Sequence, residues 1–174
     1  GQATTGSVTI DNKNAGAAGQ INGTAFSTAG GYGIQAITTT GTILVDNDAD
    51  IGTATFGVDA AGIFAKLTGG GTNTVTVNNN GKVYVDGAGT TYGVAIISTS
   101  TGDSTINNTG LIDPPTYGLY NSGAGNVTVN NSGNVLANLT GIYAESTGSN
   151  AFTGKVKSTG GAASTVDGTA GNGI

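Results

Sequence analysis

The chain has 174 residues, of which 33 are glycine, and it contains no cysteine, methionine, tryptophan, histidine or arginine, so disulfides and thiolate metal sites are excluded. Its formal net charge is −5, and its five lysines are scattered, which argues against a surface that tracks the phosphates of a nucleic acid. No stretch approaches the roughly 20 consecutive apolar residues of a membrane-spanning helix, and the regular aliphatic positions argue against a disordered linker.

One short phrase, a variable residue followed by glycine and an aliphatic residue, returns along the whole chain. Its copies are YGI at 32, AGI at 61, YGV at 92, YGL at 117, TGI at 140 and NGI at 172. Their glycines are separated by 29, 31, 25, 23 and 32 residues. A period of roughly 20 to 50 residues is typical of a solenoid in which each repeat forms one coil. The chain therefore divides into units of about 23 residues with insertions.

Each unit keeps one order of phrases. An alternating segment that ends in asparagine predicts a strand, because β-branched residues recur there with a period of two. These segments are VTIDN from 8, ILVDN from 43, VTVNN from 75, STINN from 104 and VTVNN from 127. In three units a glycine follows two residues after the last asparagine, at Gly81, Gly110 and Gly133, and we expect it to adopt a positive φ at a corner into a second short strand. The glycine phrase forms the third strand.

Three short strands and three corners per unit predict an all-β fold, a right-handed parallel β-helix of about six coils, as one domain over residues 1–174. One unit cannot close a core, so equivalent strands of successive coils must pair in parallel and stack their aliphatic side chains. The right hand follows from the right-handedness of about 98% of parallel crossovers. The expected inward columns are Ile10, Val45, Val77, Ile106 and Val129, and Ile34, Ile63, Val94, Leu119, Ile142 and Ile174.

The asparagines that end the alternating segments lie at one corner of the predicted coil. They are Asn12, Asn47, Asn79, Asn108 and Asn131. Stacked amides at successive corners can each donate to one neighbour and accept from the other, which predicts a structural asparagine ladder. The alternative is a row of amides that grips a ligand, and it is disfavoured because amides at such a corner already have partners.

Tyr32, Tyr92 and Tyr117 precede the glycine in three units. Their parity with the aliphatic column predicts partial burial, and the alternative is an aromatic stack on the surface that binds a sugar or a protein. Loop insertions are expected near 15–31 and 48–61, where binding sites on rigid scaffolds usually lie, and an irregular last coil is expected over 147–174.

Asp46, Asp48 and Asp50 form the only carboxylate cluster in the sequence. Their spacing begins like that of a calcium-binding EF-hand loop, but Ile51 and Gly57 stand where that loop requires glycine and glutamate. Solvated acids at a turn are the favoured interpretation, a weak calcium site is the alternative, and no other cofactor is expected. A polysaccharide lyase or hydrolase needs a carboxylate pair or metal with a basic group. Without arginine or histidine, and with the other acids scattered, we expect no enzyme.

The phrases VTVNNSGNVLANLTGIYAES from 127 and VTVNNNGKVYVDGAGTTYGVAI from 75 resemble the β-helical passenger repeats of bacterial autotransporters and of filamentous haemagglutinin-like surface adhesins. The likeness is clearest over about residues 42–146. It implies a right-handed β-helix, export across the Gram-negative envelope and a role as a stalk or adhesive fibre. The sequence shows neither that family's membrane barrel nor a signal peptide, so we expect an excised segment or a small protein that reaches the surface by another route. No family binding residues transfer.

The leading hypothesis is an extracellular structural or adhesive rod at the bacterial cell surface. Such a rod projects, or assembles head to tail into filaments through the open strand edges of its terminal coils, and its other partners are a host or neighbouring cell surface, glycan or matrix. The alternative is a carbohydrate- or receptor-binding module that uses the three tyrosines and the inserted loops. A polysaccharide lyase or hydrolase centred on Asp46 is the third hypothesis.

Overall fold

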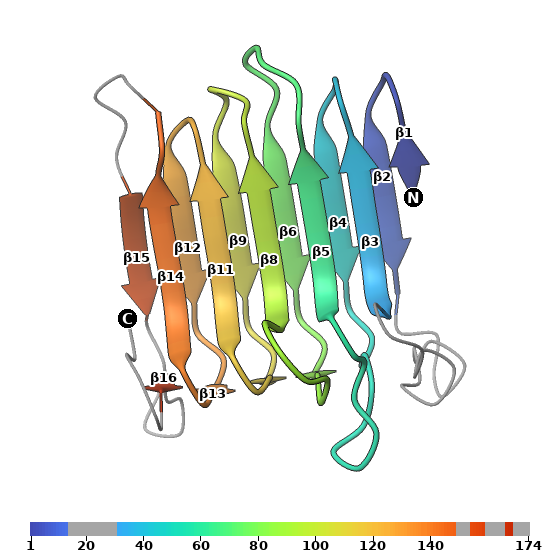
Figure 1. Cartoon of the computed structure of the whole chain (residues 1–174), viewed down its shortest axis with the longest axis vertical. Coiled ribbons are helices and arrows are strands. Elements are labelled where there is room, and N and C mark those ends of the chain that lie inside the picture. The colour runs from blue at the N-terminus through green and yellow to red at the C-terminus, as the bar shows by residue number, and fades with distance from the viewer. Residues whose placement is uncertain (14–30, 149–153, 159–165, 169–174) are drawn as a thin grey trace.

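A computed structural model describes residues 1–13, 31–148, 154–158 and 166–168, and every regular element in these ranges is a strand (Figure 1). The strands form three parallel sheets that run side by side along the rod. Sheet A contains, in spatial order, β1 (Gln2–Ala3), β3 (Tyr32–Thr38), β5 (Ala61–Leu67), β8 (Tyr92–Ser98), β11 (Tyr117–Gly123) and β14 (Thr140–Ser146).

The other two sheets have the same spatial order along the rod. Sheet B contains β2 (Val8–Asn12), β4 (Ile43–Asn47), β6 (Val75–Asn79), β9 (Ser104–Asn108), β12 (Val127–Asn131) and β15 (Gly154–Ser158). Sheet C contains β7 (Val83–Tyr84), β10 (Ile112–Asp113), β13 (Val135–Ala137) and β16 (Val166–Gly168).

Each coil passes through sheets A, B and C in that order and then returns to sheet A one strand further along. In Figure 1 the strands of the near sheet point upward and those of the far sheet point downward, while the coils advance from the N-terminal to the C-terminal end. This winding is right-handed. The prediction of a right-handed parallel β-helix with three strands per coil is therefore confirmed.

The core consists of the predicted aliphatic columns. Val45, Val77, Ile106 and Val129 pair in step across sheet B and are fully buried, whereas Ile10 at the first coil is only partly buried. In sheet A the paired residues are Ile34, Ile63, Val94, Leu119 and Ile142. Ile174 lies outside the described residues. Because alternate residues of every strand face inward, each coil adds one layer of aliphatic side chains to a continuous core.

The glycine of the repeated phrase is required for space. A Cβ atom on Gly93 would overlap with Cγ2 of Ile112, a fully buried residue of sheet C, and would lie 2.7 Å from the carbonyl oxygen of Gly118. Gly62 and Gly118 meet Val83 and Val135 in the same way. A column of missing side chains in sheet A therefore makes room for the aliphatic column of sheet C.

The glycines at the asparagine corner have a different role from the one that the sequence predicts. The described residues with positive φ are Gly6, Gly41, Gly52, Gly71 and Gly89. Gly81, Gly110 and Gly133 are not among them, so the prediction of a positive φ at these three corners is wrong. A Cβ atom on Gly110 would overlap with the carbonyl oxygen of Gly81 in the coil before it, so close stacking of the backbones requires glycine here.

The insertion at 48–61 is only partly a loop. Ile51 and Val58 are fully buried and form isolated parallel bridges to Val83 and Val85, so both ends of the insertion continue sheet C into the second coil. Residues 52–57 leave the rod between them. The insertion near 15–31 and most of the last coil at 147–174 lie outside the described residues.

Replacing Gly93 by alanine should destabilise the protein. The added methyl group has no space between Ile112 and Gly118, and overpacking of this kind costs about 1–3 kcal/mol. Gly70→Ala is the matched control, because a Cβ atom there meets nothing within 4 Å. Urea unfolding followed by circular dichroism measures both variants, and equal midpoints for the two would contradict the packing argument.

Candidate functional site

The predicted asparagine ladder is present along the inner corner between sheets B and C. In each step the side-chain Nδ2 of one asparagine donates to Oδ1 of the asparagine in the next coil. The bonds run from Asn12 to Asn47 at 2.6 Å, Asn47 to Asn79 at 2.7 Å, Asn79 to Asn108 at 2.8 Å and Asn108 to Asn131 at 2.8 Å. The ladder prediction is therefore confirmed.

The same amides also close the corner of their own coil. Nδ2 of Asn47, Asn79 and Asn108 donates to the carbonyl oxygen two residues ahead, at 2.8, 2.8 and 3.0 Å. Both hydrogens of each Nδ2 are therefore used inside the protein. These buried amides hold the turn and the stack together, and they offer a ligand no donor.

Asn79→Ala should cost about 3 kcal/mol of unfolding free energy, because it leaves buried partners on Asn47, Gly81 and Asn108 without a hydrogen bond. Its neighbour Asn78 is the matched control, since Asn78 lies on the partly exposed side where water can replace the amide. Asn78→Ala should cost less than about 1 kcal/mol. Denaturant titration of the two variants makes the comparison, and a larger loss for Asn78→Ala would contradict the structural role of the inner ladder.

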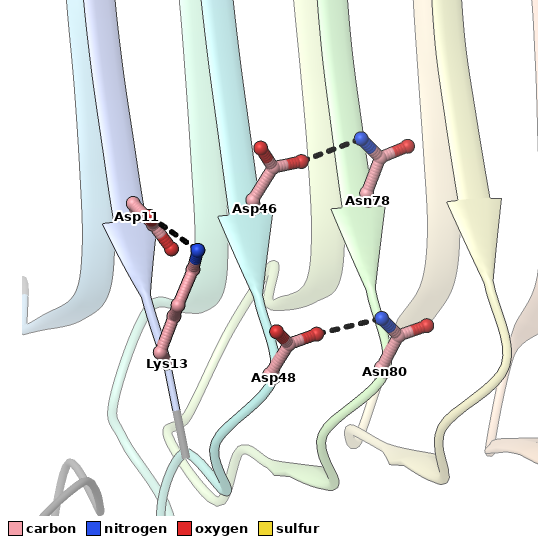
Figure 2. A network of polar contacts seen from close by, with 6 residues as sticks. All are labelled: Asp11, Lys13, Asp46, Asp48, Asn78 and Asn80. Atoms are coloured by element: carbon pink, nitrogen blue, oxygen red, sulfur yellow. Dashed lines mark hydrogen bonds and ion pairs between the residues drawn. The ribbon is translucent and has the colours of Figure 1, made fainter. Parts of the chain in front are cut away.

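A second ladder, which the sequence interpretation missed, runs along the outer face of sheet B. Nδ2 of Asn78 donates to Oδ1 of Asp46 at 2.6 Å, Asn107 donates to Asn78 at 2.7 Å, and Asn130 donates to Asn107 at 2.8 Å (Figure 2 shows the first bond). In each pair of this outer ladder the donor belongs to the later coil, whereas in the inner ladder the donor belongs to the earlier coil. The paired asparagines of the NN phrase were the available signal, because adjacent residues of a strand face opposite sides.

The three aspartates of the calcium hypothesis form separate contacts. Asp46 accepts from Asn78, and Asp48 accepts from Nδ2 of Asn80 at 2.7 Å (Figure 2). Asp50 accepts from the backbone N–H of Lys82 at 2.9 Å. Within the described residues no group of three acidic side chains is placed to hold a metal ion. The structure therefore does not bring these carboxylates together into one ligand set.

Acidic side chains gather toward the first coils of sheet B. Asp11 stands beside Asp46 in the strand register, and Oδ2 of Asp11 lies 3.1 Å from Nζ of Lys13 (Figure 2). The hydrogen bond from Lys13 to Asp11, together with the charge of that carboxylate, raises the pKa of Lys13 above its usual value. Two carboxylates one strand spacing apart repel each other, and the ammonium group of Lys13 offsets part of this repulsion.

The predicted tyrosines belong to a larger aromatic cluster on the outer face of sheet A. Tyr92 stacks on Tyr117 with ring centroids 5.5 Å apart, and Tyr120 stacks on Tyr143 at 4.7 Å. Edge contacts join the two pairs. Each stacked ring gives one face to its neighbour, so less ring surface remains for a sugar at this place. Tyr120 and Tyr143 were missed by the sequence interpretation, although they occupy one register.

Tyr32 stands apart from this cluster. Ala61 separates it from Tyr92 in the register, and its ring contacts Phe64 at a centroid distance of 5.2 Å. Tyr32, Tyr92 and Tyr117 are all partly buried, as their parity predicts. The three tyrosines therefore do not form one continuous row.

The hydroxyl of Tyr143 donates to Oε2 of Glu145 at 2.7 Å, and this bond is the main cause that raises the pKa of Tyr143 to about 12. Glu145→Gln removes the charged acceptor, so the pKa of Tyr143 should fall toward the ordinary tyrosine value of about 10. Absorbance titration at alkaline pH, compared with Tyr143→Phe, isolates this residue. An unchanged titration midpoint in Glu145→Gln would contradict the assignment of the bond.

A cavity of about 310 Å³ lies between the inserted loop and the outer face of sheet C. Asp86 and Asp113 both line it, together with Tyr84. Oδ2 of Asp86 accepts the backbone N–H of Gly57 at 2.9 Å, and burial raises the pKa of Asp113. We expected the acids outside the aspartate cluster to be single and scattered. That expectation is wrong for Asp86 and Asp113, which are 27 positions apart in the sequence but line the same cavity.

The chain was compared with protein-family models, with curated proteins and with solved structures. No protein-family model, no curated protein and no solved structure matches it significantly. Across the part of the chain that the structure describes, no helix has the length and apolar character needed to cross a bilayer. The arrangement of parallel sheets and stacked asparagines is that of a parallel β-solenoid.

Proposed function

We propose that this protein is an extracellular structural and adhesive rod of the bacterial cell surface, which projects from the cell or assembles head to tail into a fibre. Its hydrogen bonds support this function, because the three sheets and the two side-chain ladders all bond along the rod axis. The repeated phrases that resemble autotransporter passenger repeats and haemagglutinin-like adhesins support the surface location.

Sheet B supplies both edges of the proposed fibre junction. Among the described strands, β2 and β15 each have a neighbour in sheet B on one side only. The register pairs Asn130 with Lys157 at one edge and Asp11 with Asp46 at the other. If β15 of one copy continued onto β2 of the next copy in the same step, Lys157 would stand beside Asp11. A parallel strand addition of this kind does not close on itself, so it produces a filament.

Charge favours this polarity of assembly. The acidic side of sheet B carries Asp11 and Asp46, and the opposite edge carries Lys155 and Lys157 in its register. Joining unlike edges pairs opposite charges across adjacent strands, whereas joining two acidic edges would place carboxylates together. Electrostatic attraction of this kind accelerates association and weakens at high salt.

Electron microscopy of the purified chain should show fibres, and fibre diffraction should show an axial repeat of about 4.8 Å. Lys157→Asp and Asp11→Lys should each reduce fibre formation at least tenfold, and the double variant should restore it. Lys82→Asp is the matched control, because Lys82 is exposed and lies away from both edges.

These experiments test fibre formation and the register of the junction separately. A strictly monomeric chain at high concentration would contradict assembly into fibres. Fibres that form equally well in the single charge variants would contradict the register of the junction while leaving the fibre itself intact.

A further inference from the structure

The inserted loop 52–57 is a rigid rim rather than a free excursion. Ile51 before it and Val58 after it exchange backbone hydrogen bonds with the strand that contains Tyr84, at 2.9 and 3.0 Å. Inside the loop, Thr53 and Phe56 bond to each other through both backbone N–H groups, at 2.7 and 3.1 Å. A loop fixed at both ends and closed by its own turn can present a preformed surface at little entropic cost.

The loop covers one side of the cavity, and sheet C supplies the other. The lining residues come from three successive coils. Tyr84 belongs to the third coil, Asp113, Pro114 and Pro115 belong to the fourth, and Asn138 belongs to the fifth. Its volume of about 310 Å³ lies at the lower end of the range of small-molecule sites, about 300–1,000 Å³. This size fits a ligand of one or two sugar rings.

The charges of the cavity select against anions. Asp86 and Asp113 both line it, and no lysine does. Asp86 accepts one bond, from the N–H of Gly57. Asp113 is partly desolvated. A carboxylate in this state gains stability from a ligand that brings its own donors.

The lining residues of the cavity fit some classes of ligand better than others. A divalent cation needs more ligands than this pair supplies, and no group of three acidic side chains is placed for a metal within the described residues. A purely apolar ligand would cover the partly desolvated carboxylate of Asp113 without supplying a donor to it. Tyr84, Pro114 and Pro115 line the cavity beside the carboxylates and are the residues that can supply apolar surface there. A compound with hydroxyl donors along one edge and C–H groups on its face matches both the carboxylate acceptors and the apolar lining.

We propose that the cavity between loop 52–57 and sheet C binds a neutral saccharide, with the carboxylates of Asp86 and Asp113 accepting ring hydroxyls and Tyr84 packing on the sugar face. This site goes beyond the function of the rod as a scaffold, because it gives one face of the rod a ligand. It also differs from a site on the tyrosine cluster of sheet A, where each stacked ring gives one face to its neighbour.

An array of neutral, amino and acidic oligosaccharides tests the proposal with the full chain, and the best neutral compound is then titrated in solution by calorimetry. We expect saturable binding of neutral saccharides. Tyr84→Ala and Asp113→Asn should each lower the affinity at least tenfold. Tyr92→Ala is the matched control, because it removes the same side chain from sheet A, and it should bind like the unaltered chain. Circular dichroism establishes that each variant is folded.

Several results would overturn the proposal. Absence of binding at millimolar concentrations of every neutral saccharide would do so. Preference for amino sugars over their neutral counterparts would assign the carboxylates to an amine ligand, and preference for acidic sugars would contradict the charge argument. Loss of binding in Tyr92→Ala with retention in Tyr84→Ala would move the site to the tyrosine cluster.

Discussion

The in-step stacking of one coil on the next is the constraint on which the rest of the structure depends. Each pair of neighbouring coils is joined by parallel backbone bonds in sheets A and B and, at the corner, by a bond between two buried asparagines such as Asn79 and Asn108. A shift of one residue would send every inward side chain outward. The asparagine bond forms only in the correct register, so it specifies the register as well as stabilising it.

The two ladders carry their donors in opposite directions. Asn79 donates toward the C-terminal end of the rod, whereas its neighbour Asn107 donates toward the N-terminal end. The amide dipoles of the two columns therefore oppose each other, which limits the field that one long column would build up along the axis. The outer column begins at the carboxylate of Asp46, a strong acceptor for the first donor in the series. Side-chain hydrogen bonds thus run along the rod in both directions.

The core repeats the same aliphatic positions in every coil, so the features that could bind a ligand lie where the repeat is interrupted. The extra residues of the second coil continue sheet C at Ile51 and Val58, and the loop between them lines an open cavity together with the following coils. Elsewhere sheet C is only two or three residues wide per coil, as in β10, which ends at Asp113 directly before two prolines. A rigid scaffold with one anchored insertion places acidic and aromatic side chains from distant positions around the same space.

The sequence by itself determined the period, the strand order within a coil, the aliphatic columns and the inner asparagine ladder, because these depend on alternation and on residues that recur at equivalent positions. Only the tertiary structure decided which side chains meet across coils of unequal length. Asp86 and Asp113 lie at unequal distances after the ladder asparagines of neighbouring coils, and the pairing of Tyr84 with Asp113 in sheet C brings both to one cavity. The corner glycines also needed the structure, since Gly110 is required by the backbone of the coil stacked on it and not by its own φ.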